Sequence, residues 1–227
     1  MGKVVARINV RDVRIAFLTE DSTAGATYEP PIQVPGTMQI QLAPRVASAA
    51  LHGDGRMRHQ TNRVDGYDVT FDHNFIPSKL LARMMGNTID TNGIRRGNVS
   101  NQPAEFAMGW VVDLVGEEVE LTWLPKCVAA PSNKNIQQTT DSIEYSTDSL
   151  TVTSMPLEYN GDYEYVADTS DEDSGFTKGD VAAFLANVPV DAVQGNPLPS
   201  DATPAAQVQK IAATAASDAR SDTDKDK

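Results

Sequence analysis

Apolar and polar residues alternate along much of the first 168 positions, which is typical of strands with one buried face. Tyr67, Val69 and Phe71 alternate with polar residues that include Asp68 and Asp72, so this strand has one apolar and one acidic face. The whole pattern predicts roughly seven or eight strands. The other predicted strand segments are 13–17, 38–42, 106–112, 119–123, 150–153 and 163–166.

Turn-forming residues separate these segments. Asn92-Gly93 and Asn160-Gly161 are pairs whose tolerance of positive φ suits tight hairpin turns, which favours antiparallel pairing. Two longer stretches, 43–64 and 87–102, are predicted to be loops. The pattern therefore predicts a mainly β fold, an antiparallel β-sandwich or barrel-like unit.

One short amphipathic helix interrupts the strands at residues 78–86. Leu80 and Met84 belong to its apolar stripe, Ser78 is placed to cap its start, and Gly86 is placed to end it in the left-handed conformation. We expect this flanking helix to lie against the open face of a sheet.

The composition changes after Asp168. We predict a β domain over 1–168, then an acidic linker and a short helix over 169–192. The tail over 193–227 is rich in Ala, Pro, Ser and Asp and is expected to be disordered, because it has too little apolar surface to offset the entropy of ordering. The second helix is expected around 180–187, with an apolar stripe of Val181, Phe184, Leu185 and Val188.

Charge is distributed unevenly over the 227 residues, whose formal net charge is −12. Residues 1–100 hold 12 Lys and Arg against 9 Asp and Glu, whereas residues 101–227 hold 7 against 22. The acidic balance argues against ordinary nucleic-acid binding, which needs cations to neutralise phosphates. No apolar run has the length of a membrane-spanning helix and no export signal is indicated, so we expect a soluble protein without a membrane partner.

Residues with catalytic or metal-binding chemistry are few. Cys127 is the only cysteine, which excludes an intrachain disulfide and a multi-thiolate metal site. Lys126 is placed to lower the thiol pKa slightly, but a buried cysteine near a strand end is the favoured interpretation. His52 and His59 fall in a predicted loop rich in Gly and Arg, and together with His73 they lack metal-ligand spacing on a helix. The sequence therefore predicts no enzyme, no cofactor and no metal site.

Several short segments between residues 8 and 168 occur in a characteristic order. They are 9–21, 27–38, 49–55, 66–71, 77–86, 107–110, 121–127 and 161–168. In this order they resemble the major tail proteins of long-tailed phages, the subunits of the tail tube.

That resemblance implies a β-sandwich or barrel-like subunit that assembles into hexameric rings stacked into a hollow tube. The tube conducts double-stranded DNA during ejection without binding it specifically, and no reaction is catalysed. The implied partners are other copies of the chain, the tail-terminator and tail-tip proteins, and the tape-measure protein inside the tube during assembly. The implied location is the virion tail, assembled in the host cytoplasm.

A DNA conduit must repel phosphates rather than hold them, so acidic strand faces are candidates for its inner wall. Asp68 and Asp72 are the predicted lumen-facing residues. The segments 43–64 and 87–102 are the candidates for joining rings, since their cations can meet the acidic half of the next copy. The candidate inter-ring residues are Arg56, Arg58, Arg95 and Arg96.

Two other functions remain open from the residues. One is a β-sandwich that binds carbohydrate or a host surface, with Trp110 and Trp123 as stacking platforms, although core packing is the favoured use of both. The other is a hydrolase with paired carboxylates, which requires two acids positioned in a cleft.

Overall fold

The computed structural model describes residues 6–53, 56–131, 148–171 and 176–190. The chain divides into two units, Met1–Val190 and Asp191–Lys227, and all described residues belong to the first. The predicted tail over 193–227 and most of the acidic linker, 172–175, lie outside them. The described strands are β1 (Arg7–Ser22), β2 (Gly25–Tyr28), β3 (Ile32–Val34), β4 (Thr37–Gly53), β5 (Arg56–His73), β6 (Thr88–Ile89), β7 (Arg95–Arg96), β8 (Glu105–Leu114), β9 (Val119–Ala129), β10 (Asp148–Met155) and β11 (Tyr165–Asp168), and the helices are α1 (Ser78–Met84) and α2 (Val181–Ala186).

The unit is mainly β, and its strands pair antiparallel, as predicted. The main sheet has the order β2-β1-β8-β9-β10-β5-β4, with β3 also on β1 and β11 also on β9. β3 pairs with β1 at one end of this order, and the chain then turns at Pro35-Gly36 to begin β4 at the other end. Gly36 has φ +85 and accepts a hydrogen bond from the Asn74 N–H at 2.9 Å. The chain thus connects the two ends of the sheet directly, and in this sense the sheet is barrel-like. The barrel is not closed, because no hydrogen-bonded pair of described strands joins the two ends.

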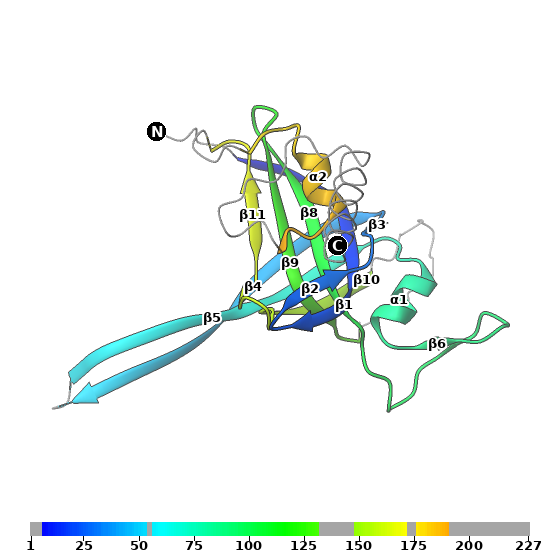
Figure 1. Cartoon of the computed structure of the whole chain (residues 1–227), viewed down its shortest axis with the longest axis horizontal. Coiled ribbons are helices and arrows are strands. Elements are labelled where there is room, and N and C mark those ends of the chain that lie inside the picture. Colours follow the sequence, from blue (N-terminus) through cyan, green and yellow to red (C-terminus); the bar gives the residue numbers. More distant parts are fainter. Residues whose placement is uncertain (1–5, 54–55, 132–147, 172–175, 191–227) are drawn as a thin grey trace, which may run out of the picture. The chain divides into compact units, whose positions relative to one another are not determined.

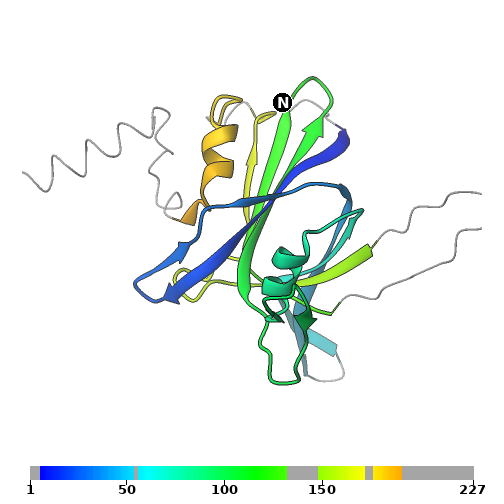
Figure 2. The ribbon, with the colours of Figure 1, turned by 90° about the vertical axis from the view of Figure 1, so that its right-hand side faces the viewer.

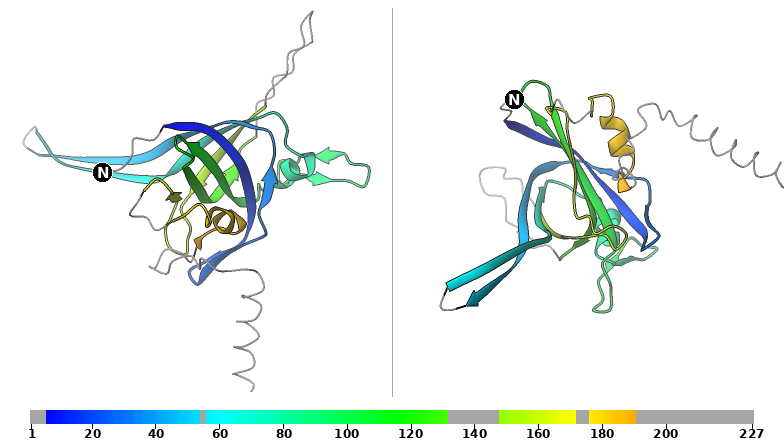
Figure 3. Two further views of the ribbon diagram at one scale, coloured as in Figure 1. Left: turned by 90° about the horizontal axis from the view of Figure 1, so that it is seen from above. Right: turned by 60° about the vertical axis from the view of Figure 1, so that its left-hand side comes forward.

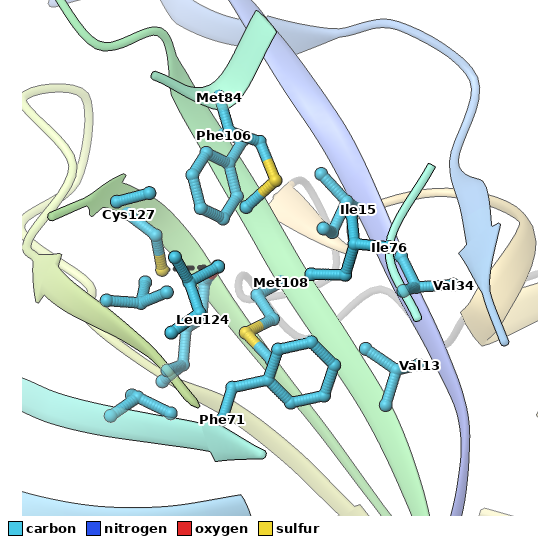
Figure 4. Close-up of a cluster of buried hydrophobic side chains, with 14 of the residues drawn as sticks. Val13, Ile15, Val34, Phe71, Ile76, Met84, Phe106, Met108, Leu124 and Cys127 are labelled. Carbon is cyan, nitrogen blue, oxygen red and sulfur yellow. Dashed lines mark hydrogen bonds between the residues drawn. The ribbon is translucent and has the colours of Figure 1, made fainter. Parts of the chain in front are cut away.

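The core lies on the concave side of this sheet, where the alternating apolar residues meet. Val13 and Ile15 of β1 face Phe71 of β5 and Met108 of β8 (Figure 4). Along β8 the inward residues are Phe106, Met108 and Trp110, as the period of two predicts. The predicted segments form strands, but β8 differs from a strand with one buried face, because Ala107 and Val111 on its other face are buried as well.

Helix α1 packs against one end of this core. Leu80 and Met84 are buried in the same cluster as Phe106, and Figure 2 places α1 away from the turn that joins β8 to β9. The predicted Ser78 cap is wrong: Pro77 occupies the N-cap, and no side chain caps the helix. The predicted end is confirmed, since Gly86 has φ +65 and donates to the Arg83 carbonyl at 3.0 Å in a Schellman-type ending.

Helix α2 covers the other side of the sheet, and the prediction of a helix around 180–187 is confirmed. Phe184 and Leu185 are buried. The last-turn carbonyls of α2 need donors from outside the helix. The indole Nε1 of Trp123 donates to the Phe184 carbonyl at 3.0 Å, and Arg14 donates to the Leu185 carbonyl at 3.2 Å. These bonds tie α2 to β9 and β1.

Two of the three predictions about connections change, and one is confirmed. The stretch 43–64 is not a loop but the outer halves of β4 and β5, so His52 and His59 lie in strands. Asn92-Gly93 does turn between paired strands, β6 and β7. Asn160-Gly161 turns between β10 and β11, but these strands do not form a hairpin, because both pair with successive parts of β9.

Candidate functional site

The outer halves of β4 and β5 form a two-stranded projection, which we call the arm and define as Val46–Gly53 with Arg56–Val64. Its strands stay paired from Val46 with Val64 to Gly53 with Arg56, with one irregularity beside Leu51. The arm leads away from the rest of the sheet (Figure 1). Every residue over 46–51 and 56–64 is exposed, so neither face of the arm packs on its own unit.

Large apolar side chains are exposed on the arm. Leu51 is 65% exposed and Met57 is 59% exposed near its tip, while Val46 and Val64 face each other near its base. An isolated two-stranded hairpin is marginally stable in water, and exposed apolar groups commonly mark interaction surfaces. The arm therefore has the character of a segment that another molecule covers.

The four candidate arginines fall on two separate projections. Arg56 and Arg58 lie in the arm, near its tip. Arg95 and Arg96 form β7 in the small hairpin with β6, and Arg96 is 3.3 Å from the Asp90 carboxylate. Two views place the arm and the β6–β7 hairpin on opposite sides of the unit (Figures 1 and 3), so the structure does not bring the four arginines together.

Asp68 and Asp72 lie on one face of β5, as predicted, opposite the buried Val69 and Phe71. Thr153 of β10 donates to the Asp68 carboxylate at 3.3 Å. The neighbouring strands extend this surface with uncharged polar side chains, and we call the set the polar face. Its residues are Gln39 and Gln41 of β4, Asp68, Thr70 and Asp72 of β5, and Ser149, Thr151 and Thr153 of β10.

Arg45 lies at the border of the polar face. Its Nε is 3.7 Å from the Asp68 carboxylate, and its guanidinium donates to the Asp65 carbonyl at 3.2 Å and to the Ser154 carbonyl. The cation is thus held against the backbone where the arm leaves the sheet. The polar face as defined above contains two carboxylates, those of Asp68 and Asp72, and no cationic residue.

A groove of about 600 Å³ lies near the turn from β8 to β9, because the last residues of β8 and the first residues of β9 line it. Figure 2 places α1 away from that turn. One wall comes from residues 7–10 of β1 and another from residues 38–42 of β4. The two walls belong to strands at opposite ends of the sheet order, and the groove is the space they leave between them. The groove has both apolar and polar lining residues; the apolar ones are Ile8, Val10, Met38, Ile40, Leu42, Trp110 and Val112.

Two carboxylates stand at the groove. Glu120 accepts two close hydrogen bonds, at 2.8 and 2.9 Å, from Nη2 of Arg7, so its charge is matched locally. Glu164 accepts a hydrogen bond from the Tyr67 hydroxyl at 2.9 Å. Burial, together with the Glu164 carboxylate, raises the pKa of Tyr67 to about 12, so the hydroxyl stays protonated and keeps donating at neutral pH.

No local sequence pattern predicts this groove. Its lining residues come from β1, β4, β5, β8 and β9 and from the segment before β11. Only the register of the strands brings them together. The sole local hint is that the polar residues Glu120 and Thr122 alternate with apolar residues in β9.

The predicted packing of both tryptophans in the core is confirmed. Trp123 is fully buried and Trp110 is 3% exposed. Gly109, beside Trp123 in the register, has no room for a side chain, because a Cβ there would lie 2.5 Å from the indole ring. Neither ring presents a face on which a sugar can stack.

Cys127 is buried, as predicted, and burial raises the pKa of its thiol. The expected lowering by Lys126 is wrong, because the Lys126 ammonium pairs with Asp21 at 2.8 Å and Glu105 at 3.6 Å instead. A thiol with a raised pKa is a poor nucleophile at neutral pH. His73 is also buried, beside Phe71, whereas His59 is exposed on the arm.

Asp21 anchors the segment between β10 and β11. Its side chain is 5% exposed and accepts hydrogen bonds from Lys126 and from the backbone N–H groups of Glu158 and Tyr159, the last two at 3.1 and 3.3 Å. Burial alone would raise the pKa of Asp21, but these hydrogen bonds outweigh it and hold the pKa below its ordinary value. The carboxylate therefore stays ionised in the folded protein.

Within the described ranges, no group of three His, Cys, Asp or Glu side chains is arranged to hold a metal ion. None of the helices in this same part of the chain combines the length and the apolar character needed to cross a bilayer. Compared with known proteins, the chain matches no protein-family model and no curated protein sequence.

Proposed function

We propose that this chain is the structural subunit of a phage tail tube, forming stacked hexameric rings whose electronegative lumen conducts double-stranded DNA during ejection. The arm is the observation that carries this proposal. It is a long paired projection with Leu51 and Met57 exposed near its tip, and it needs a partner to cover it. The hexameric order is taken from the resemblance of the sequence to tail-tube proteins.

Unpaired strand edges support self-association. β4 is the last strand in the sheet order, so no other described strand pairs with its outer edge. Open edges invite pairing with another chain, and a closed ring of copies removes them. Contacts between different surfaces of identical copies produce a ring when they close and an open filament when they do not. A stacked tube needs closed contacts within each ring and open contacts from one ring to the next.

The polar face supports the lumen assignment. Asp68 and Asp72 lie among Gln, Ser and Thr side chains, and this surface offers few cations to DNA phosphates. Each cationic contact to phosphate would add a salt-dependent binding free energy that slows passage of the DNA. The formal charge of −12 adds a repulsive field of the same sign.

The role proposed is structural and not enzymatic. Further partners under this proposal are the tail-terminator, tail-tip and tape-measure proteins, and the site of action is the virion tail. Arg56 and Arg58 on the arm, and Arg95 and Arg96 on the β6–β7 hairpin, are proposed to contact neighbouring rings from two sides of the subunit.

Negative-stain electron microscopy of the purified full chain tests the proposal. We expect rings or tubes with the native chain, and only single subunits when residues 47–63 are replaced by an Asn-Gly turn, which leaves the paired Val46 and Val64 on either side of it. The shortened variant should keep the native circular dichroism of the core, because the arm packs on nothing in its own unit. Phe75→Ala, at an exposed site between β5 and α1 and outside both candidate ring-joining segments, is the control and should assemble normally. A native chain that remains a single subunit at every concentration would refute the proposal.

A further inference from the structure

The groove between β1 and β4 is an uncovered part of the core. Val10, Ile40, Leu42 and Val112 pack against the buried cluster from this side and are only partly buried themselves. At the opposite end α1 inserts Leu80 and Met84. One end of the barrel-like sheet is therefore covered by α1, and the groove at the other end leaves these partly buried apolar side chains without such a cover among the described residues.

We propose that this groove receives the tip of the arm from a second copy of the chain. This inference rests on the proposed function and names the surface that the arm contacts. The occupant is the part of the arm around Leu51, Arg56 and Met57.

The apolar surfaces are complementary. Leu51 and Met57 are each more than half exposed on the arm and have no apolar surface to cover them in their own unit. The groove offers the partly buried side chains of Val10, Ile40 and Leu42. Bringing the two surfaces together removes apolar area from water on both sides, which is the main driving force for association.

The charges are complementary as well. Arg56 lies at the arm tip beside Met57. At the groove, Arg7 matches Glu120, but the hydrogen-bond donor to Glu164 is the neutral Tyr67 hydroxyl. No ion pair between described residues includes Glu164, so the groove has a carboxylate ready for a cation from another molecule. An incoming arginine supplies that cation and orients the tip.

The arm cannot fill the groove of its own copy. Leu42, the last β4 residue in the groove wall, and His52, which pairs with Met57 at the tip, are ten positions apart in the sequence. An extended strand rises about 3.3 Å per residue, so the tip lies roughly 30 Å farther along β4. Figure 1 shows the arm leading away from the sheet. The contact is therefore between different surfaces of two copies, which propagates from copy to copy.

Cross-linking between engineered cysteines tests the contact. Met57→Cys at the arm tip and Met38→Cys at the groove wall both replace exposed side chains, and the native Cys127 is buried and does not react. The double variant is assembled, treated with a short bismaleimide and analysed by denaturing electrophoresis. We expect a ladder of dimers, trimers and higher species. A mixture of the two single variants should stop at dimers, and each single variant alone should give monomers.

The controls separate this inference from the proposed function. Met57→Cys combined with Val99→Cys, an exposed site away from the groove, should give no ladder. Tubes that form normally while the Met57–Met38 pair never links, or links no better than the Val99 pair, would overturn the groove contact and leave the proposed function standing. Dimers of the Met57→Cys single variant would also overturn it, because they would place arm against arm. A native chain that never assembles would overturn both.

Discussion

The two halves of the β4–β5 hairpin behave differently although the same strands run through both. In the inner half, Val69 and Phe71 are buried while Asp68 on the other face is exposed. In the outer half, the arm, every described residue from Arg56 to Val64 is exposed, yet the pairing with β4 continues. Backbone pairing thus extends well beyond the part of the hairpin that has a core to pack on.

This difference separates stability from association. The inner half contributes to folding of the single unit because it buries apolar area. The arm exposes apolar area, which costs solubility in a single copy and is useful only when a partner covers it. Substitutions in the inner half should therefore change the free energy of unfolding, whereas substitutions in the arm should change assembly.

The largest expected effect is at Phe71. Phe71→Ala leaves a cavity among Val13, Met108 and Leu124, and should lower the free energy of unfolding by about 3–5 kcal/mol. Chemical denaturation followed by tryptophan fluorescence measures it. A loss below about 1 kcal/mol would mean that the inner half is not packed as described and would remove the contrast with the arm.

Gly109→Ala should be the next most severe change. The added Cβ would lie 2.5 Å from the Trp123 ring, and Trp123 is held by its bond to the Phe184 carbonyl. Overpacking of this kind costs about 1–3 kcal/mol, and we expect the upper part of that range because the indole has no space to move. Thermal unfolding measures the loss. Ala107→Gly is the control, because Ala107 lies on β8 like Gly109 and its replacement changes backbone freedom without adding a clash.

Acid should weaken the unit through Asp21. Its pKa is lowered in the folded state, so its contribution to stability is complete above the unfolded pKa of about 3.9 and is lost as pH falls through the lower folded value. Asp21→Asn should lose about 1–2 kcal/mol at pH 7, since Lys126 then lacks its closest carboxylate. The variant should also show a shallower fall in melting temperature between pH 5 and pH 3. Parallel curves for the two proteins would contradict this.

The β6–β7 hairpin gives a second exposed projection to compare with the arm. Reversing the charges with Arg95→Glu and Arg96→Glu should change the melting point little, because both side chains are exposed and ion pairs such as that of Arg96 with Asp90 are worth at most about 1 kcal/mol. Tube length and yield should fall if these arginines contact the acidic part of a neighbouring ring. Unchanged tubes would exclude the two arginines from the ring contacts and leave the arm as the remaining candidate.

The inner half was predictable from the sequence and the arm was not, for a physical reason. A strand with one buried face must alternate, and Tyr67, Val69 and Phe71 carry that pattern. The arm buries neither face in the single copy, so Arg56–Val64 has no alternation and resembles a polar loop.

The candidate site divides in the same way. The acidic face with Asp68 and Asp72 follows from alternation, and so does burial of Trp110 and Trp123. The groove depends on which strands become neighbours in space, and that register is set by packing across the whole sheet. Local patterns in the sequence therefore do not predict the groove.

The smallest effect on stability, and the sharpest test of the contrast, is at Met57. Met57→Ala removes an exposed side chain from the arm, so the free energy of unfolding should change by less than about 0.5 kcal/mol. Assembly should weaken clearly, because the lost apolar area is area that a partner covers. Sedimentation at several concentrations measures assembly, and denaturation of the same preparation measures folding. A variant that loses stability and still assembles would reverse the roles assigned to the two halves, because the arm would then support its own unit rather than its neighbour.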